Sequence, residues 1–501
     1  MLADVYDTQG AANFPKQDIK AWGTSLFMEG KLNDWLTARS ITSYRKDDSA
    51  TPIDFDALPT VDLDVPGYYK NRQFSQEVQF LISAGKLNGL IGAYYLNASA
   101  LTQFESRLYT TSPGFAAFTN ADIGTDTLAG FADFTYDLTD QLSLSVGGRY
   151  TWDQRNGYIL RQNYLNGGSP VFGSAGIKFL GAQTDFRGKS TFKKFTPKAS
   201  ISFKPAPGHQ VYASFSQGFK GGGFDPRGVG INALDLNNDG VKSQDEIAKF
   251  LSFRPEKVDS YEVGYKADLF DRRVYLALAG FYMDYTDVQI PGSVACNAGG
   301  VATFCGVVSN AGKARMQGLE AETRAKLIQS DMGTLTLTGS VGYIDAKYTM
   351  YITNIASVPT DVAAFRKVQN TPAWSGAVGL DYAMDLMGGT LTASGGMSFK
   401  GKTYQFEVPN PYLDQKAYQL YDASLVYRAE GGRWSLGVFG KNLTNKKYKT
   451  SGYTFMAANA TTGALTTLAN GTLVPALGKE GVLTAFYGNP RQVYVTASLN
   501  F

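Results

Sequence analysis

The chain has 501 residues, a formal net charge of +3 and a single histidine, His209. A charge so close to zero does not call for a nucleic-acid partner, and one histidine argues against a histidine-based metal centre or a Ser-His-Asp triad. We therefore expect no enzyme activity. Hydrophobic residues make up 44% of the chain, yet no run approaches the roughly 18 apolar residues of a membrane helix. The 30 Tyr, 31 Phe and 55 Gly instead favour alternating strands with aromatic girdles.

The first 17 residues contain neither a basic stretch nor an apolar stretch, so they do not predict a signal peptide. Strands with aromatic girdles are typical of membrane β-barrels, and such a barrel must be exported. The sequence therefore leaves two alternatives: the chain is a fragment of a longer protein, or it is not a membrane barrel.

Strand-like alternation recurs along the chain, interrupted by short polar turns. Eight tight connections are predicted, near residues 30–31, 84–85, 139–140, 205–208, 270–272, 330–333, 386–388 and 430–432. Apolar and polar residues alternate on both sides of these turns, for example over 142–153, 319–327 and 335–343. Eight hairpins and a final strand over 492–501 give about 17 strands.

The clearest hairpin spans residues 257–287. Tyr261, Val263 and Tyr265 fall on one face of an extended strand, and Glu262 and Lys266 fall on the other. Its two strands are longer than the usual 5 to 6 residues of soluble proteins and match the roughly 9 to 11 residues that cross a bilayer. We therefore expect one unit of a transmembrane antiparallel β-barrel.

Long segments rich in Gly, Asn, Pro and Tyr separate the hairpins. They are predicted to be irregular and cover about 46–71, 156–190, 221–256, 287–312, 350–372, 402–417 and 449–490. Short turns at one end and long loops at the other are typical of outer-membrane barrels, with periplasmic turns and extracellular loops. The alternatives are a soluble β-sandwich or a propeller, although the repeat motifs of propellers are missing.

The last ten residues place Val493, Val495, Ala497, Leu499 and Phe501 on one face. This pattern predicts a lipid-facing strand that ends on an aromatic residue. It resembles the terminal strand that the outer-membrane assembly machinery recognises.

Several segments, taken in order, resemble TonB-dependent outer-membrane receptors. They are SITSYR (40–45), FSQEVQF (74–80), FTPKASISF (195–203), VYASFSQGFKGGGFDP (211–226), PEKVDSYEVGYKADL (255–269), NAGKARMQGLEAE (310–322), NTPAWS (370–375) and FGKNLTNKKY (439–448). The resemblance spans nearly the whole sequence. It implies a 22-stranded barrel with an N-terminal plug, which an inner-membrane complex pulls through a short N-terminal box.

This sequence departs from that pattern because no plug or box precedes Ser40 and the first strands are absent. We expect residues 1–501 to be a partial barrel that lacks its N-terminal plug. The resemblance implies a bacterial outer-membrane location and three partners: outer-membrane lipid, the TonB complex through the missing plug, and a small-molecule ligand such as a metal chelate.

Within the predicted extracellular loop 221–256, the stretch DLNNDGVKSQDE (235–246) fits the calcium-loop pattern D-x-[DN]-x-[DN]-G-x₅-E. Ca²⁺ prefers six to eight oxygen ligands. We expect a structural Ca²⁺ held by oxygens of Asp235, Asn237, Asp239, Val241, Ser243 and Glu246. Lys242 replaces the usual apolar residue, and no amphipathic helix leads in, so an Asn/Asp-rich surface turn is the alternative.

Cys296 and Cys305 lie in another predicted outer loop, CNAGGVATFC. Exported proteins meet an oxidising compartment, so we expect a disulfide between them, with two free thiols as the alternative. No haem is expected. VPNPYL (408–413) only weakly resembles the NPNL motif of haem receptors, and no histidine lies between it and FRPE (253–256).

Basic and aromatic side chains of the predicted loops are candidates for contacting an anionic or aromatic ligand through charge and stacking. They are Lys220, Arg227, Arg366, Tyr404 and Tyr412, with Lys367, Tyr453 and Phe455 as further candidates. A role in packing the loops is the alternative for each of them.

The function predicted from the resemblance is energy-coupled uptake of a scarce nutrient, with a ferric siderophore as the first choice and a carbohydrate or another nutrient as the next. A passive porin and a calcium-dependent surface adhesin are the competing classes.

Overall fold

The computed structural model describes residues 4–12, 14–298, 300–355 and 358–500, and these are almost entirely β-structure. One α-helix, α1 (Gln244–Leu251), and short 3₁₀ turns accompany the strands. The strands are β1 (Asp18–Asn33), β2 (Leu36–Asp54), β3 (Asp62–Ala84), β4 (Leu87–Leu108), β5 (Ala116–Asp137), β6 (Leu142–Leu165), β7 (Ile177–Phe203), β8 (His209–Lys220), β9 (Gly223–Phe224), β10 (Ser252–Phe253), β11 (Glu256–Leu269), β12 (Val274–Ala298), β13 (Val301–Ser330), β14 (Gly333–Ile355), β15 (Val358–Asp361), β16 (Trp374–Leu386), β17 (Gly389–Lys400), β18 (Tyr418–Arg428), β19 (Trp434–Lys441), β20 (Lys449–Thr454), β21 (Leu483–Tyr487) and β22 (Gln492–Leu499).

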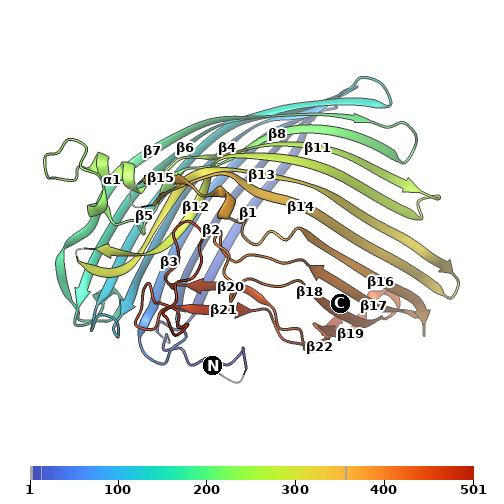
Figure 1. The fold of residues 1–501 in the computed structure, drawn as a ribbon. Coiled ribbons are helices and arrows are strands. Elements are labelled where there is room, and N and C mark those ends of the chain that lie inside the picture. The colour runs from blue at the N-terminus through green and yellow to red at the C-terminus, as the bar shows by residue number, and fades with distance from the viewer. Residues whose placement is uncertain (1–3, 13, 299, 356–357, 501) are drawn as a thin grey trace.

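The main sheet is an antiparallel meander of 18 strands among the described residues. Each long strand pairs with the next in sequence, and β8–β11, β14–β16 and β19–β22 are neighbours across the loops that separate them. Without the four-residue β15, which pairs only with the end of β14, 17 strands remain, as the sequence predicts. The sheet curves into a trough in Figure 1, with β1 and β22 as its edge strands.

Short turns join the strands at one end of the trough, which we call the turn end. At the β11–β12 turn, Phe270, Asp271 and Arg272 all have positive φ, and the Arg273 amide donates to the Phe270 carbonyl (3.1 Å). Seven of the eight predicted turns lie where expected. The first is displaced, because β1 continues to Asn33 and the turn falls on residues 34–35 rather than 30–31.

Apolar side chains line the outer surface of the strands. Val263 is 60% exposed and Leu319 is 65% exposed, although both lie within long strands. Exposed apolar side chains occur on seven strands of the sheet: Val263, Leu319, Val341, Val378, Leu425, Val438 and Val495. An exposed apolar surface that extends over so many strands matches the lipid-facing band of a membrane barrel.

Polar side chains on the opposite face bond to one another across strands. The Tyr212 hydroxyl donates to Glu262 (2.5 Å), the Thr42 hydroxyl to Gln76 (2.6 Å), and the Ser394 hydroxyl to Asp381 (2.5 Å). Side chains on alternate positions of a strand point to opposite faces, so this second face is the polar lumen of the curved sheet.

Several segments that the sequence predicts as irregular are instead continuations of strands. β12 and β13 run without interruption through most of 287–312, and β2 and β3 cover most of 46–71. β13 has 30 residues, about three times the number needed to cross a bilayer. Beyond the membrane, an antiparallel partner still forms hydrogen bonds with the backbone amides and carbonyls of these strands. The content of Gly, Asn and Pro does not reveal that such a partner is present.

The compact apolar clusters lie at the ends of the strands that face the long loops and combine strand residues with loop residues. One contains Phe55, Leu108, Phe115, Phe455 and Val482. Another packs α1 through Ile247 and Leu251 against Phe186 and Ile159. None of the helices in the described residues has the length and apolar character needed to cross a membrane.

The lipid-facing and polar faces of β16 predict that a lysine at neighbouring positions has different effects on the stability of the folded state. Val378→Lys places a charge in the apolar band and is expected to destabilise the folded state by about 2 to 4 kcal/mol. Ala377→Lys is the control, because Ala377 pairs with Ser340 and Ser398 on the polar face. Urea unfolding in lipid vesicles measures both, and equal losses would contradict the assignment of the two faces.

Candidate functional site

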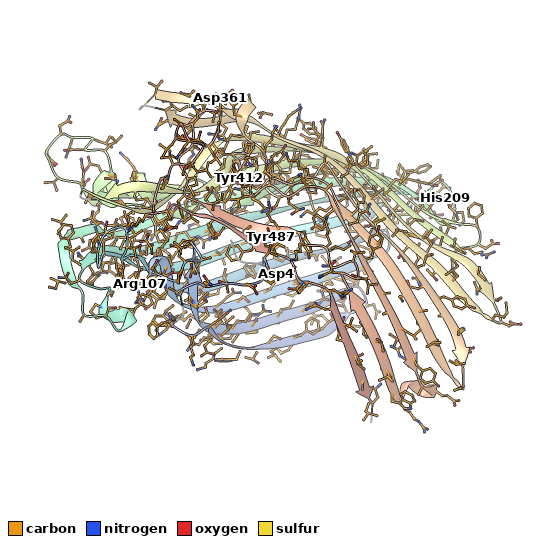
Figure 2. The ribbon with its side chains drawn as sticks, turned by 60° about the horizontal axis from the view of Figure 1, so that its bottom comes forward. Asp4, Arg107, His209, Asp361, Tyr412 and Tyr487 are labelled. Carbon is orange, nitrogen blue, oxygen red and sulfur yellow. A yellow bond between two sulfur atoms is a disulfide. The ribbon has the colours of Figure 1, made fainter. Side chains whose placement is uncertain are left out.

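The long segments gather at the end of the trough opposite the short turns, which we call the loop end. Figure 2 shows His209, at the start of β8, at the turn end, and Arg107, near the end of β4, at the loop end. The helix α1, the β12–β13 hairpin tip and the segment 449–490 all belong to this end (Figure 1). Every candidate site residue from the sequence lies on one of the long segments, except Lys220, which is the last residue of β8.

The first half of the calcium-like loop is a series of tight side-chain-to-backbone turns. Asp235 Oδ2 accepts from the Gly240 amide (2.9 Å), Asn237 Oδ1 from the Asp239 amide (3.2 Å), and Asp239 Oδ1 from the Val241 amide (2.7 Å). Gly240 has φ +80, a conformation that L side chains rarely adopt. Asp235 Oδ1 is buried without a hydrogen-bond partner.

The second half of the loop is the N-terminus of α1. Ser243 accepts from the Glu246 amide, and Glu246 Oε2 accepts from the amide and hydroxyl of Ser243 (2.9 and 2.8 Å), which completes a capping box. Glu246 Oε1 accepts from the Leu236 amide (2.6 Å). The amides of Leu236 and Ser243 hold the pKa of Glu246 down at about 2, so its carboxylate is charged at neutral pH.

The structure therefore brings Asp235, Asn237, Asp239, Ser243 and Glu246 into one loop, linked by backbone bonds. Among the described residues, however, the acidic group whose ligand atoms all lie within 4.8 Å of one another is Asp54, Asp56 and Asp64, and not the acidic residues of this loop. The oxygens of Glu246 serve the helix cap and the Leu236 amide in this conformation.

The loop is anchored to the sheet on the side of β7. Gln244 donates from Nε2 to the Asp185 carbonyl (2.9 Å), and its Oε1 accepts from the Arg187 amide (2.9 Å). Together with the apolar contacts of α1, these bonds hold the loop against β6 and β7.

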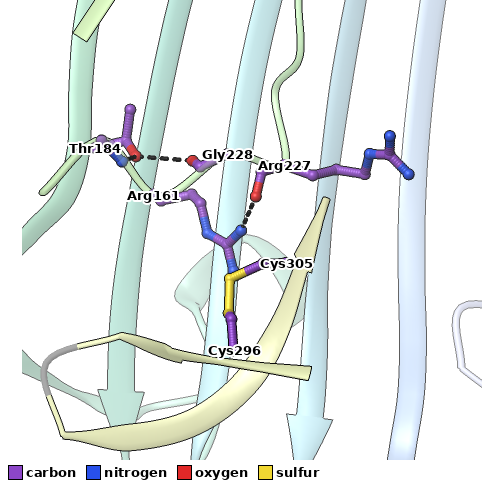
Figure 3. Close-up of a disulfide and its surroundings, with 7 residues drawn as sticks. Arg161, Thr184, Arg227, Gly228, Cys296 and Cys305 are labelled. Carbon is purple, nitrogen blue, oxygen red and sulfur yellow. Dashed lines mark hydrogen bonds between the residues drawn. A yellow bond between two sulfur atoms is a disulfide. The ribbon is translucent and has the colours of Figure 1, made fainter. Parts of the chain in front are cut away.

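The predicted disulfide is present between Cys296 and Cys305, whose Cα atoms are 5.8 Å apart. It joins β12 and β13 near the tip of their hairpin and packs against Val229 of the loop 221–256. Figure 3 shows the guanidinium of Arg161 beside the disulfide, where it donates to the Arg227 carbonyl. The Gly306 amide also donates to that carbonyl (3.4 Å), so the hairpin and the loop 221–256 lie together.

Two of the basic candidates have structural partners. Arg227 forms a two-point ion pair with Asp225, with Nη2–Oδ2 and Nε–Oδ1 distances of 2.8 and 3.0 Å. Arg366 is 8% exposed and donates to the carbonyls of Thr461 (2.9 Å) and Ala460 (3.0 Å), and its guanidinium lies 5.4 Å from the centre of the Tyr351 ring. These contacts hold loop segments in place.

A second group is more open. The ammonium of Lys402 lies 4.5 Å from the centre of the Tyr404 ring and that of Lys367 lies 5.9 Å from it. Tyr412 is exposed, and Lys220 is exposed at the end of β8. Tyr453 and Phe455 instead pack against Phe55. The structure thus separates an accessible Lys–Tyr group from residues that build the loop core.

Sequence reasoning missed the buried charges at this end. Glu105 is fully buried, accepts from the Ser169 amide (2.7 Å), and pairs with Arg107 (2.7 Å). The aspartates 54, 56, 62 and 64 also meet here. Four aspartates in eleven residues, DFDALPTVDLD, were a signal that the sequence already contained.

Comparisons with known proteins agree with this architecture. The family model "TonB dependent receptor-like, beta-barrel" matches residues 3–443. The pesticin receptor of Yersinia pestis is 25% identical over 329 residues, which cover 66% of this chain and 40% of the relative. The metal-pseudopaline receptor CntO of Pseudomonas aeruginosa is 25% identical over 195 residues, covering 39% of this chain and 22% of the relative.

Among solved structures, the ferric yersiniabactin uptake receptor FyuA of Yersinia pestis has a TM-score of 0.67 at 18% identity, covering 96% of this chain and 61% of that one. The siderophore receptor PiuA of Acinetobacter baumannii has a TM-score of 0.64 at 16% identity, covering 96% and 64%. The matches thus span less than two thirds of each of these proteins.

The fold and its loop end define a bacterial outer-membrane β-barrel. More narrowly, the chain belongs to the TonB-dependent receptor-like β-barrel family.

The contacts of Arg366 predict a structural effect. Arg366→Ala removes both bonds to residues 460–461 and is expected to speed amide hydrogen exchange over 457–468 severalfold, because that loop loses its anchor. Lys367→Ala is the control. Unchanged exchange in the Arg366 variant would show that the loop does not depend on this side chain.

Proposed function

We propose that this barrel is the membrane part of a TonB-dependent receptor that takes up a metal chelate, with a ferric siderophore as the first candidate. The observation that carries the proposal is the family match over residues 3–443, together with relatives named as receptors for pesticin and for metal-pseudopaline. A carbohydrate or another nutrient remains the second candidate for the ligand.

The Lys–Tyr group at the loop end supports a chelate ligand. The ammonium groups of Lys402 and Lys367 lie 4.5 and 5.9 Å from the centre of the Tyr404 ring, and Tyr412 is exposed on the same segment 402–417. Aromatic faces and cations together suit an anionic ligand with aromatic rings, through stacking and charge. Lys220, Arg227 and Arg366 complete the proposed ligand-binding set, with Arg227 and Arg366 acting through the loops that they hold.

Coupling to TonB is part of the same proposal. In this class of receptor, an inner-membrane complex uses the proton-motive force to pull on a plug domain through a short TonB box. Translation of the DNA upstream of residue 1 tests this step: a plug and a box encoded there support coupled uptake, whereas their absence favours a passive porin.

Growth and binding test the ligand. A strain that depends on the complete receptor for iron should grow on ferric siderophore, and binding should weaken at least tenfold in a Lys402→Ala, Tyr404→Ala variant. Lys86→Ala, at the turn end, is the control. Constitutive conductance without binding of any ferric chelate would support the porin instead.

We also propose that the loop 235–246 binds Ca²⁺ as a structural ion. The unpartnered Oδ1 of Asp235 and the charged carboxylate of Glu246 support this assignment. If both oxygens of Glu246 bind the ion, its carboxylate must give up its hydrogen bonds to Leu236 and Ser243. Ion binding therefore competes with the capping box. A surface adhesin would use the same ion, but to bind other surfaces rather than to order a loop.

Isothermal titration with Ca²⁺ tests this assignment. Glu246→Gln is expected to abolish the binding heat of this loop, because the twelfth position of such loops supplies two oxygens. Asp245→Asn is the matched control, since Asp245 is the neighbouring acidic residue of α1 and is not a proposed ligand. Equal heats from both variants would refute the site.

A further inference from the structure

A second group of carboxylates lies at the loop end, where β2 ends and β3 begins. Asp54 is the last residue of β2, and Asp64 faces it directly on β3 in the register of the two strands. Asp56 lies in the connection between them. The ligand oxygens of these three residues all lie within 4.8 Å of one another.

Asp64 is the most deeply placed of the three. It is 3% exposed, and its Oδ1 is buried without a hydrogen-bond partner. Like charges directly opposite each other on paired strands destabilise a sheet, and a buried carboxylate without a partner carries a large desolvation cost. The pairing of Asp54 with Asp64 is therefore stabilised by a compensating positive charge.

Within the part of the chain that the structure describes, no ion pair supplies that charge. Among the described residues, no Lys, Arg or His nitrogen lies within 4.0 Å of a carboxylate oxygen of Asp54, Asp56 or Asp64. Arg107 stands opposite Asp64 on β4, but its guanidinium pairs with the fully buried Glu105.

Backbone amides fix the direction of the carboxylates. Asp54 accepts from the amides of Ala57 (2.6 Å) and Ala12 (3.3 Å), and Asp56 accepts from the amide of Leu58 (3.0 Å). These bonds hold Asp54 and Asp56 in place beside Asp64.

We propose that Asp54, Asp56 and Asp64 bind a hard divalent cation of the Ca²⁺ class. Three carboxylates and no sulfur or imidazole match the oxygen ligands that Ca²⁺ prefers, and extracellular sites of this kind fill at roughly 10⁻⁴ to 10⁻³ M. The cation replaces the missing positive charge between the paired strands.

The site joins loops that are distant in sequence. Neighbouring Asp62 accepts from the amide and hydroxyl of Thr111 (3.2 and 2.7 Å) and from the Lys479 amide (3.3 Å). Phe55 and Leu63, adjacent to the ligands, belong to the apolar cluster with Leu477 and Val482. Cation binding at this hairpin therefore stabilises its contacts with residues 108–115 and 477–482.

Equilibrium dialysis with radioactive Ca²⁺ tests the proposal on the full chain in detergent. The measurement is made in a Glu246→Gln background, so that the loop 235–246 does not contribute. One Ca²⁺ per chain is expected, with affinity at least tenfold weaker in Asp64→Asn and in Asp56→Asn. Asp48→Asn is the control, because Asp48 lies on the same strand and pairs with Lys46.

Proteolysis provides a second measurement. Ca²⁺ is expected to slow trypsin cleavage after the exposed Lys479 severalfold, and the Asp56→Asn variant should lose this protection. Circular dichroism confirms that each variant is folded, and Asp56→Asn decides the question if Asp64→Asn does not fold. The proposal is overturned if the Glu246→Gln chain binds no Ca²⁺, or if neither aspartate variant weakens binding. In that case, bound protons rather than a cation neutralise the carboxylates of Asp54, Asp56 and Asp64.

Discussion

The backbone hydrogen-bond ladder is the constraint on which the rest of this structure depends. Hydrocarbon offers no partner to an unpaired amide or carbonyl, so a strand that crosses it must be paired along its whole length. The meander meets this requirement for the long strands between its two edges, whereas the edge strands β1 and β22 have a partner on one side only among the described residues. Once paired, the alternation of side chains sends Val263 or Leu319 toward lipid and Glu262 or Gln76 toward the lumen.

Compact packing of apolar side chains against each other occurs only beyond the membrane. In the bilayer the apolar face needs no second protein layer, because lipid covers it. At the loop end the same strands continue into water and must bury apolar side chains against each other. The clusters around Phe115 and around α1, the Cys296–Cys305 disulfide and the Arg161–Arg227 contact are the means by which these projecting hairpins become one surface. A family of receptors can thus vary its ligand surface while it keeps the barrel.

The acidic residues at the loop end differ in whether the protein supplies a basic partner. Glu105 has Arg107 and Asp225 has Arg227, so these buried acids are paired within the protein. The aspartates at the end of β2 and start of β3 lack such a partner among the described residues, and the loop 235–246 leaves one oxygen of Asp235 unpaired. The proposed cation site at these aspartates therefore lies where the fold holds carboxylates together without an ion pair in the described part of the chain, whereas in the loop 235–246 Lys242 approaches Asp235 to 3.9 Å and leaves its other oxygen unpaired.

The sequence by itself determined the barrel class, the number of strands, most of the turns and the two-faced character of each strand, because period-two alternation and turn residues act locally. It also determined the disulfide partners, because the chain has only two cysteines. It placed the first turn four residues early and took the extended hairpins 46–71 and 287–312 for irregular loops, because their pairing depends on a partner strand and not on local composition. It found the calcium-like loop, whose residues are contiguous. Only the tertiary structure decided that Arg366 anchors residues 460–461, that Phe455 is core, and that Asp54 faces Asp64, because these contacts join residues brought together by strand register.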